Sequence, residues 1–455
     1  MLQLYDTAKR AKVDFVPSVE GRVSMYVCGP SPYDVPHLGH GRKEVVFDTI
    51  RRYLAWRGYA VRYVSNVTDI EDKIIARARE EGTTEPELVA RYEVTFRSAF
   101  ERLNILQPDD EPRATEWIDE MIRLIAQLVT NGHAYVVEGQ GVYFQVDTLP
   151  TYGSLSHRTL DELLESAGAR VDVDERKRAP VDFALWKSAK PGEPVWDSPW
   201  GPGRPGWHIE CSAMSLKLLG DGFDIHGGGS DLVFPHHENE IAQAVGAGHE
   251  FARYWLHNGM LTVDGEKMSK SLGNFTTLID LLEKHDPRAF RLLVLQTHYR
   301  KQMEIGEKEV SDAEKAIGRL DALARRVRAE GLPSGPEQVS DVTAFRDAMD
   351  DDFNTPAAVA EVFSLVSDAN LALDQNLRET AAAAFTTAQE LAAVLGIELR
   401  ADAPEADAEI DALVEAREAA RRARDWAEAD RLRDELSRRG IVVEDTPRGP
   451  VWRRE

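Results

Sequence analysis

The stretch that decides the fold reads Ser24-Met-Tyr-Val-Cys28-Gly-Pro-Ser-Pro-Tyr-Asp-Val-Pro36-His-Leu-Gly-His40. Residues 24–28 predict a short strand, which Gly29 and Pro30 end. The residues after His40 predict a helix closed by Gly58, and residues 61–64 predict a second strand that ends near Asn66 and Thr68. Strand, helix and strand in this order open a doubly wound (Rossmann-type) α/β domain, whose ligands bind at the carboxyl ends of its strands. The apolar residues on one face of the predicted helix are Val46, Ile50, Tyr53 and Leu54.

Length, composition and charge narrow the class of protein. With 455 residues, 43% hydrophobic and 29% charged, the chain is typical of a globular protein of several domains. We find no secretory start and no apolar run of the ~18 residues that span a bilayer, so a cytoplasmic protein without a membrane partner is expected. The net charge of −23 argues against indiscriminate nucleic-acid binding, but it allows a local basic surface.

Changes of pattern along the chain predict a catalytic domain split by an insertion and followed by helices. The insertion is rich in turns and includes a predicted strand at 143–146 and a loop at 201–206. Ser311 and Glu314 form a capping box that predicts a helix start. Residues 413–439 predict one further helix, followed by a strand at 441–443. The predicted domains are the parallel-sheet α/β catalytic domain in two halves (1–114 and 203–258), the insertion (115–202), a lysine-loop region (259–310), an all-α helical bundle (311–398) and a small C-terminal α+β domain (399–455).

Four residues have the chemistry of a zinc site. His236 and Glu240 follow Pro235 four residues apart, a spacing that puts both side chains on one helical face. Cys28 and Cys211 are the only cysteines in the chain. Free core cysteines are the alternative, and a disulfide between them is uncommon in the cytosol. Two thiolates, an imidazole and a carboxylate form a plausible tetrahedral set for Zn²⁺.

Two further motifs suggest phosphate chemistry. His37 and His40 lie where the first helix begins, and a helix start attracts phosphates through its unpaired N–H groups and its dipole. Far along the chain stands Lys267-Met268-Ser269-Lys270-Ser271. Histidines at a loop edge and lysines in a loop are each common on surfaces. In this order, however, the pair resembles the two signature motifs of class I aminoacyl-tRNA synthetases.

Three other stretches make the resemblance more specific, since they are similar to cysteinyl-tRNA synthetases over nearly the whole chain. They are Tyr26-Val27-Cys28-Gly29-Pro30, Gly206-Trp207-His208-Ile209-Glu210-Cys211-Ser212 and Phe234-Pro235-His236-His237-Glu238-Asn239-Glu240.

The resemblance implies a role for each matching position. It implies one zinc ion on Cys28, Cys211, His236 and Glu240, with the substrate's thiolate as an additional ligand. It implies cysteine binding by Cys28, Gly29, Thr68, Trp207 and His236. It implies ATP binding, with Mg²⁺, by His37, His40, Gly228, Gly229, Asp231, Lys267, Ser269 and Lys270, among which His37, His40, Lys267 and Lys270 are the catalytic residues. It implies tRNA anticodon contacts by Arg421, Trp426, Asp430 and Asp445 in the C-terminal domain.

The expected activity is ATP-dependent ligation of L-cysteine to tRNA(Cys) by a monomer. Zinc gives this reading a physical basis, because an apolar pocket separates near-isosteres such as cysteine and serine by only ~1–3 kcal/mol, whereas a soft metal prefers thiolate. A ligase that joins cysteine to an amino sugar is one alternative, but it lacks an anticodon-binding region. A non-catalytic relative is a second alternative. A nicotinamide-dependent enzyme is disfavoured, because no Gly-x-Gly-x-x-Gly follows the first strand.

Overall fold

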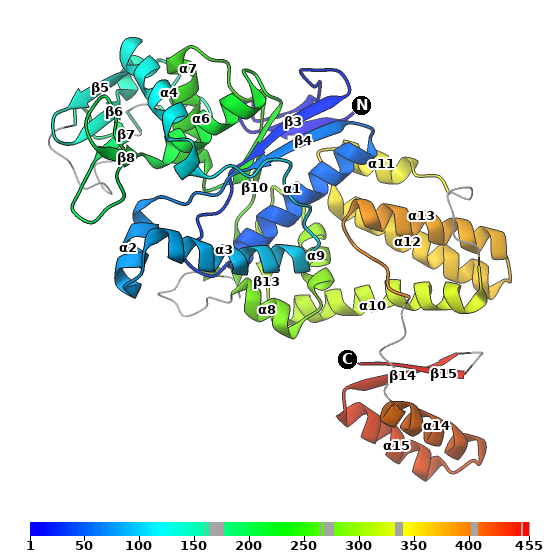
Figure 1. Ribbon diagram of the computed structural model, residues 1–455. Coiled ribbons are helices and arrows are strands. Elements are labelled where there is room, and N and C mark those ends of the chain that lie inside the picture. The colour runs from blue at the N-terminus through cyan, green and yellow to red at the C-terminus, as the bar shows by residue number, and fades with distance from the viewer. Residues whose placement is uncertain are drawn as a thin grey trace.

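The computed structural model describes residues 1–159, 161–162, 177–263, 266–267, 277–332, 340–401, 408–446 and 449–454. Figure 1 shows a central sheet with helices around it, an inserted subdomain at one end, a group of long helices at the other, and a separate C-terminal unit. The expected division into α/β, all-α and small α+β parts is therefore seen.

A four-stranded parallel sheet forms the centre of the catalytic domain. Its strand order is β10-β9-β3-β4, with every neighbouring pair parallel. The helix α1 connects β3 to β4 and packs on the sheet through buried residues such as Phe47 and Ile50. This arrangement is the predicted doubly wound type. The bounds are β3 (Arg22–Val27), α1 (Leu38–Trp56), β4 (Ala60–Ser65), β9 (Ile225–Gly229) and β10 (Tyr254–Asn258).

Two helices connect this sheet to the insertion, and a pair of short strands packs beside its edge. The helices α2 (Asp72–Glu81) and α3 (Glu85–Arg102) follow β4. A short antiparallel pair, β1 (Gln3–Asp6) and β2 (Ala11–Asp14), precedes β3, and β1 lies near β10.

The insertion is built on an antiparallel sheet with the order β5-β6-β7-β8. The prediction of a loop over 201–206 was wrong for its middle, because residues 203–205 form β8 and pair with β7. Glycine and proline were read there as turn signals, yet Gly203 and Gly206 have no room for a Cβ beside the backbone of β7. The bounds are α4 (Ile118–Thr130), β5 (Ala134–Val137), β6 (Gly141–Phe144), β7 (Phe183–Ser188) and β8 (Gly203–Pro205).

The second half of the catalytic domain adds α6 (Trp207–Leu219), a π-helical turn η3 (Val233–His237) and α7 (Glu238–Ala247). A small three-stranded sheet then follows with the order β12-β11-β13. Its strands are β11 (Leu261–Val263), β12 (Glu266–Lys267) and β13 (Met303–Ile305), and α8 (Leu278–Lys284) and α9 (Pro287–Leu295) lie between β12 and β13.

The long helices beyond β13 share one hydrophobic core with α1 and α9. The predicted start of the first helix at Ser311 was wrong, because the helix begins at Glu307 after the extended Gly306 and places Ser311 inside its second turn. The helix packs through an apolar face that includes the buried Ile317 and Leu320. The bounds are α10 (Glu307–Glu330), α11 (Thr343–Asp350), α12 (Thr355–Asp374) and α13 (Arg378–Val394).

Within the described residues, α12 is the single helix that is long and apolar enough to cross a membrane by length and composition. A core helix of a globular protein meets the same criterion, and α12 packs against α10, α11 and α13.

The C-terminal unit has a small hydrophobic core of its own, formed by Ile410, Val414, Leu436, Ile441 and Trp452. The prediction of one helix over 413–439 was wrong. Two helices are present, because Arg424 adopts a left-handed backbone (φ 58°) and the Asp425 side chain caps the second helix by accepting from Glu428 N. The bounds are α14 (Ala408–Arg422), α15 (Trp426–Arg438), β14 (Ile441–Thr446) and β15 (Gly449–Arg454).

Candidate metal centre and active site

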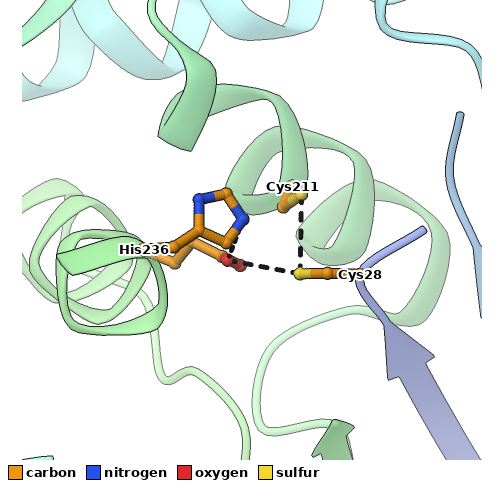
Figure 2. A group of neighbouring side chains, drawn as sticks. Cys28, Cys211 and His236 are labelled. Carbon is orange, nitrogen blue, oxygen red and sulfur yellow. Dashed lines mark hydrogen bonds and ion pairs between the residues drawn. The ribbon is translucent and has the colours of Figure 1, made fainter. Parts of the chain in front are cut away.

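Four ligand-type side chains from distant parts of the chain meet at the carboxyl end of β3. Cys28 follows β3 directly, Cys211 is on α6, His236 is in η3 and Glu240 is on α7. Their ligand atoms all lie within 4.8 Å of one another, and all four residues are buried. Figure 2 shows Cys28, Cys211 and His236 directed at one point. The arrangement fits a single metal ion.

The distances within this group agree with that interpretation. The two sulfur atoms are 3.7 Å apart, so the cysteines are free. Glu240 Oε1 lies 3.0 Å from His236 Nε2 and 3.5 Å from Cys28 Sγ. Two thiols, an imidazole and a carboxylate are the donor types that Zn²⁺ accepts.

Although these four side chains are buried, their neighbours favour the charged forms of the Cys211 thiol and the Glu240 carboxyl group. The shared hydrogen bond with Cys28 lowers the pKa of Cys211 to about 6, and burial opposes this shift. Burial raises the pKa of Cys28. Burial also disfavours the charged carboxylate of Glu240, but His226 and His236 outweigh it and lower the pKa of Glu240 to about 2. One thiolate and one carboxylate are therefore available to a cation at neutral pH.

A second, overlapping group consists of Cys28, His226, His237 and Glu240, whose ligand atoms also lie within 4.8 Å of one another. His237 Nε2 is 3.3 Å from Cys28 Sγ, and His226 Nε2 is 2.8 Å from Glu240 Oε2. Sequence reasoning did not single out these two histidines. His237 stands inside a motif that was quoted for other reasons, and His226 precedes the glycines expected to bind ATP. Nothing in their spacing indicates that the fold brings them together.

The residues expected to bind cysteine surround the metal centre. The Trp207 ring stacks on the His236 ring, with centroids 4.1 Å apart and an interplanar angle of 24°. Thr68 is buried and accepts a hydrogen bond from Asn66 Nδ2 at 3.1 Å. Gly29 donates to Asn66 Oδ1 at 2.9 Å, and a Cβ on Gly29 would lie 1.5 Å from the Asn66 carbonyl oxygen. Asn66, which the sequence indicated only as the end of a strand, thus joins the ends of β3 and β4.

His37 and His40 form the start of α1. His37 is the N-cap residue, and each histidine side chain accepts from the backbone N–H of the other. Their rings stack with centroids 3.7 Å apart. Burial and the nearby charges of His37 and Lys43 lower the pKa of His40, so its imidazole is neutral at neutral pH. The pair places two ring nitrogens at a helix start that favours anions.

The glycine-rich run forms the carboxyl-terminal part of the neighbouring strand β9 and has a packing role. A Cβ on Gly227 would lie 2.3 Å from the Phe47 ring, and one on Gly228 would lie 2.8 Å from the His237 ring. A Cβ on Gly229 would meet the carboxylate of the exposed Asp231 at 2.4 Å. The expectation that Gly228, Gly229 and Asp231 contact ATP remains a prediction.

The lysine motif falls mostly outside the described residues. Lys267 is in β12, whereas Ser269 and Lys270 lie outside. The first described residues after the motif contact the start of the histidine helix. Leu278 N donates to Pro36 O at 2.8 Å, and Thr277 forms an isolated antiparallel bridge with His37. The fold therefore brings the residues that follow the second signature motif against the first.

The four residues expected at the anticodon share the C-terminal unit. Arg421 is on α14 and ion-pairs with Glu418 at 2.8 Å, and Asp445 is in β14. Trp426 begins α15 with 61% of its surface exposed, and Asp430 is on the same helix. An exposed aromatic ring beside arginines can stack on an unpaired base.

Sequence models of three families match the chain in order. They are described as tRNA synthetases class I (C) catalytic domain (residues 14–315), DALR domain (344–400) and cysteinyl-tRNA ligase anticodon binding domain (403–453). The fold and the paired motifs thus define a class I aminoacyl-tRNA synthetase.

Curated relatives make the assignment more specific. The chain is 49% identical over 472 residues to the cysteine–tRNA ligase of Symbiobacterium thermophilum, covering 100% of this chain and 99% of the relative. It is also 49% identical over 466 residues to that of Escherichia coli O17:K52:H18, covering 100% of both. The chain belongs to the cysteine–tRNA ligase family.

Solved structures agree on the fold. The Mycobacterium tuberculosis methionyl-tRNA synthetase in complex with methionyl-adenylate matches with a TM-score of 0.60 at 19% identity, covering 82% of this chain and 89% of that one. A putative arginyl-tRNA synthetase from Campylobacter jejuni matches with a TM-score of 0.52 at 14% identity, covering 84% and 94%. At these identities the likeness concerns the fold alone.

Proposed function

We propose that this protein activates L-cysteine with ATP and transfers it to tRNA(Cys), acting as a cytoplasmic monomer with one zinc ion at its substrate site. The observation that carries the proposal is the buried group of Cys28, Cys211, His236 and Glu240 at the end of β3. A zinc ion held by these four residues would supply a soft Lewis acid for the sulfur of the substrate, which would distinguish cysteine from serine.

The first step joins the cysteine carboxylate to the α-phosphorus of ATP and releases pyrophosphate. His37 and His40 bind the phosphates at the start of α1 and stabilise the charge that develops during the reaction. The same phosphates are bound by three residues of the second motif, Lys267, Ser269 and Lys270. ATP binds together with Mg²⁺. The adenosine is bound by Gly228, Gly229 and Asp231. Catalysis here is positioning and electrostatic stabilisation.

The amino acid is held beside the metal by Gly29, Thr68 and Trp207. Stacked on His236, the Trp207 indole forms one wall of this site. In the second step the terminal ribose hydroxyl of the tRNA attacks the cysteinyl carbonyl carbon and AMP leaves. Arg421, Trp426, Asp430 and Asp445 contact the anticodon.

The test combines metal analysis with pyrophosphate exchange and tRNA charging. We expect one zinc per chain, exchange with cysteine and none with serine, and charging of tRNA(Cys). Cys211→Ala should lose the zinc and the exchange together. The matched control is Ser215→Ala, one turn further along α6, also buried, which should keep both.

Two outcomes would contradict the proposal. Full exchange by the zinc-free Cys211→Ala variant would show that the metal does not bind the substrate. Exchange with cysteine but no charging of tRNA(Cys) would instead favour the ligase that acts on an amino sugar.

A further inference from the structure

Arg42 is a buried arginine that lies two residues after His40 on α1. It is 1% exposed and is among the largest fully buried side chains of the described residues. No ion pair of the described part of the chain includes it, whereas the equally buried Arg291 pairs with Asp48. A buried charge is costly without a carboxylate partner, so the hydrogen bonds of Arg42 must supply its stabilisation.

Those hydrogen bonds go to three backbone carbonyls more than 200 residues away. Nη1 donates to Met260 O at 2.6 Å. Nη2 donates to Lys301 O at 2.5 Å and to Tyr299 O at 3.3 Å. A planar guanidinium can bind several acceptors at fixed angles, which an ammonium group on a flexible stem cannot do as well.

The three carbonyls lie in the segments just before β11 and β13. These two strands belong to the small sheet that also contains Lys267, in β12. Met260 precedes β11, which pairs with β12 through Thr262 and Lys267. Tyr299 and Lys301 precede β13, which pairs in parallel with β11. Arg42 therefore connects the helix of the histidine motif to the small sheet of the lysine motif.

The opposite side of the same segment is also fixed. The side chains of Tyr299 and Arg300 both donate to the fully buried Asp352. Segment 299–301 is thus held between Arg42 on its carbonyl side and Asp352 on its side-chain side. Gly259 allows the close approach, since a Cβ there would lie 2.3 Å from Lys301 O.

We propose that Arg42 is a positioning residue for the adenylation step, which fixes β11 and β13, and through them Lys267, relative to His37 and His40. This inference rests on the proposed function, because it assumes that both motifs contact ATP. A shift of the two motifs relative to each other would move the groups that stabilise the transition state, and small misplacements of such groups cost large factors in rate.

The test compares Arg42→Lys with Arg291→Lys, which places the same substitution at a second fully buried arginine that binds carbonyls. We expect Arg42→Lys to lower kcat of cysteine-dependent exchange by about 10-fold or more, with zinc content and KM for cysteine within about twofold of the wild type. Arg291→Lys should lower the melting temperature while its exchange stays within about twofold.

A second variant tests the same contact without altering Arg42. Gly259→Ala should displace Lys301 O and give the same loss of kcat, whereas Gly318→Ala, which has open space around it on α10, should not. This pair decides the question if Arg42→Lys does not fold.

The outcomes separate this inference from the proposed function. Absence of exchange in the wild-type protein would overturn both. Normal wild-type exchange with normal kcat in Arg42→Lys, or in Gly259→Ala where the lysine variant does not fold, would overturn this inference alone. Equal loss of kcat in Arg291→Lys would also overturn it, because a general loosening of the core would then explain the effect.

Discussion

His257 shows what burial does to a single titratable residue near the metal centre. It is 6% exposed, and its Nε2 and Nδ1 lie within hydrogen-bond distance of His237 Nδ1 (2.7 Å) and Thr7 Oγ1 (2.8 Å). Burial, aided by His226, lowers the pKa of His257 to about 3. The folded protein therefore holds this ring neutral, while the unfolded chain binds a proton below about pH 6.5.

The pH dependence of stability follows from that difference. As the pH falls from 6.5 towards 3, the unfolded state binds a proton on His257 that the folded state does not bind. The free energy of unfolding therefore decreases over this pH range. Between pH 6.5 and 5 the loss from His257 is about 2 kcal/mol. The free energy of unfolding, measured with denaturant at each pH, should decrease less with falling pH for His257→Gln than for the wild type. The control His249→Gln, at a partly exposed residue beside Asp221, should decline as the wild type does.

Trp207 is expected to contribute to the binding of cysteine. Its ring stacks on His236 without being a ligand itself. Aromatic stacking contributes about 0.5–1.5 kcal/mol, so Trp207→Leu should raise KM for cysteine by about 2- to 10-fold while zinc is retained. Trp207→Phe restores a ring and should recover most of the affinity. An unchanged KM in the leucine variant would show that the indole is ordinary packing.

The helices α10 and α13 end in the same way but in different surroundings. Each helix is followed by a glycine with a left-handed backbone, Gly331 (φ 60°) and Gly396 (φ 71°). A Cβ on Gly331 meets nothing within 4 Å, whereas one on Gly396 would lie 2.1 Å from Arg291 Nη2. The two positions share the backbone requirement and differ in packing.

Alanine at each position separates the two costs. Gly331→Ala should cost about 1–2 kcal/mol through the left-handed backbone alone. Gly396→Ala should cost more, because it also displaces the buried arginine that binds Asp48. Equal losses of unfolding free energy in the two variants would contradict this account.

The C-terminal unit matters at the scale of the whole molecule. Among the residues that the structure describes, its hydrophobic core shares none with the clusters of the catalytic and helical domains. From Arg417 to Arg454 it carries 11 basic and 8 acidic residues, a net +3, whereas residues 408–416 add three acidic residues and the whole chain carries −23. This contrast marks the segment from Arg417 to Arg454 as suited to an anionic partner.

Removal of that unit should therefore separate the two steps of the reaction. A chain ending at Arg400 should keep the metal and cysteine-dependent exchange within about threefold of the full chain. Its charging of tRNA(Cys) should fall by about 10-fold or more, since the proposed anticodon contacts would be lost. The full-length Trp426→Ala variant, which removes one exposed ring, should show a smaller loss of charging and normal exchange. Unimpaired charging by the shortened chain would exclude the proposed anticodon contacts.

Local sequence patterns predicted correctly those helices and strands whose apolar residues recur at a regular spacing. The first strand, the helix after it and the second strand were confirmed, because apolar spacing reports directly which face of an element is buried. The failures occurred where a turn signal had a different use, or where the chain turned without a turn signal. Gly203 lets β8 lie close to β7, and Arg424, which carries no turn signal, breaks a helix that its sequence favours.

The sequence alone determined the type of fold, the kinds of ligand at the metal centre and the two signature motifs. The tertiary structure decided which distant groups meet: that His226 and His237 join the metal centre, that Asn66 links two strand ends, and that Arg42 binds carbonyls at residues 260, 299 and 301. The physical reason is that periodicity and residue chemistry encode burial and ligand type. Contacts across 200 residues depend instead on how the packed elements place backbone carbonyls, and no local pattern records that.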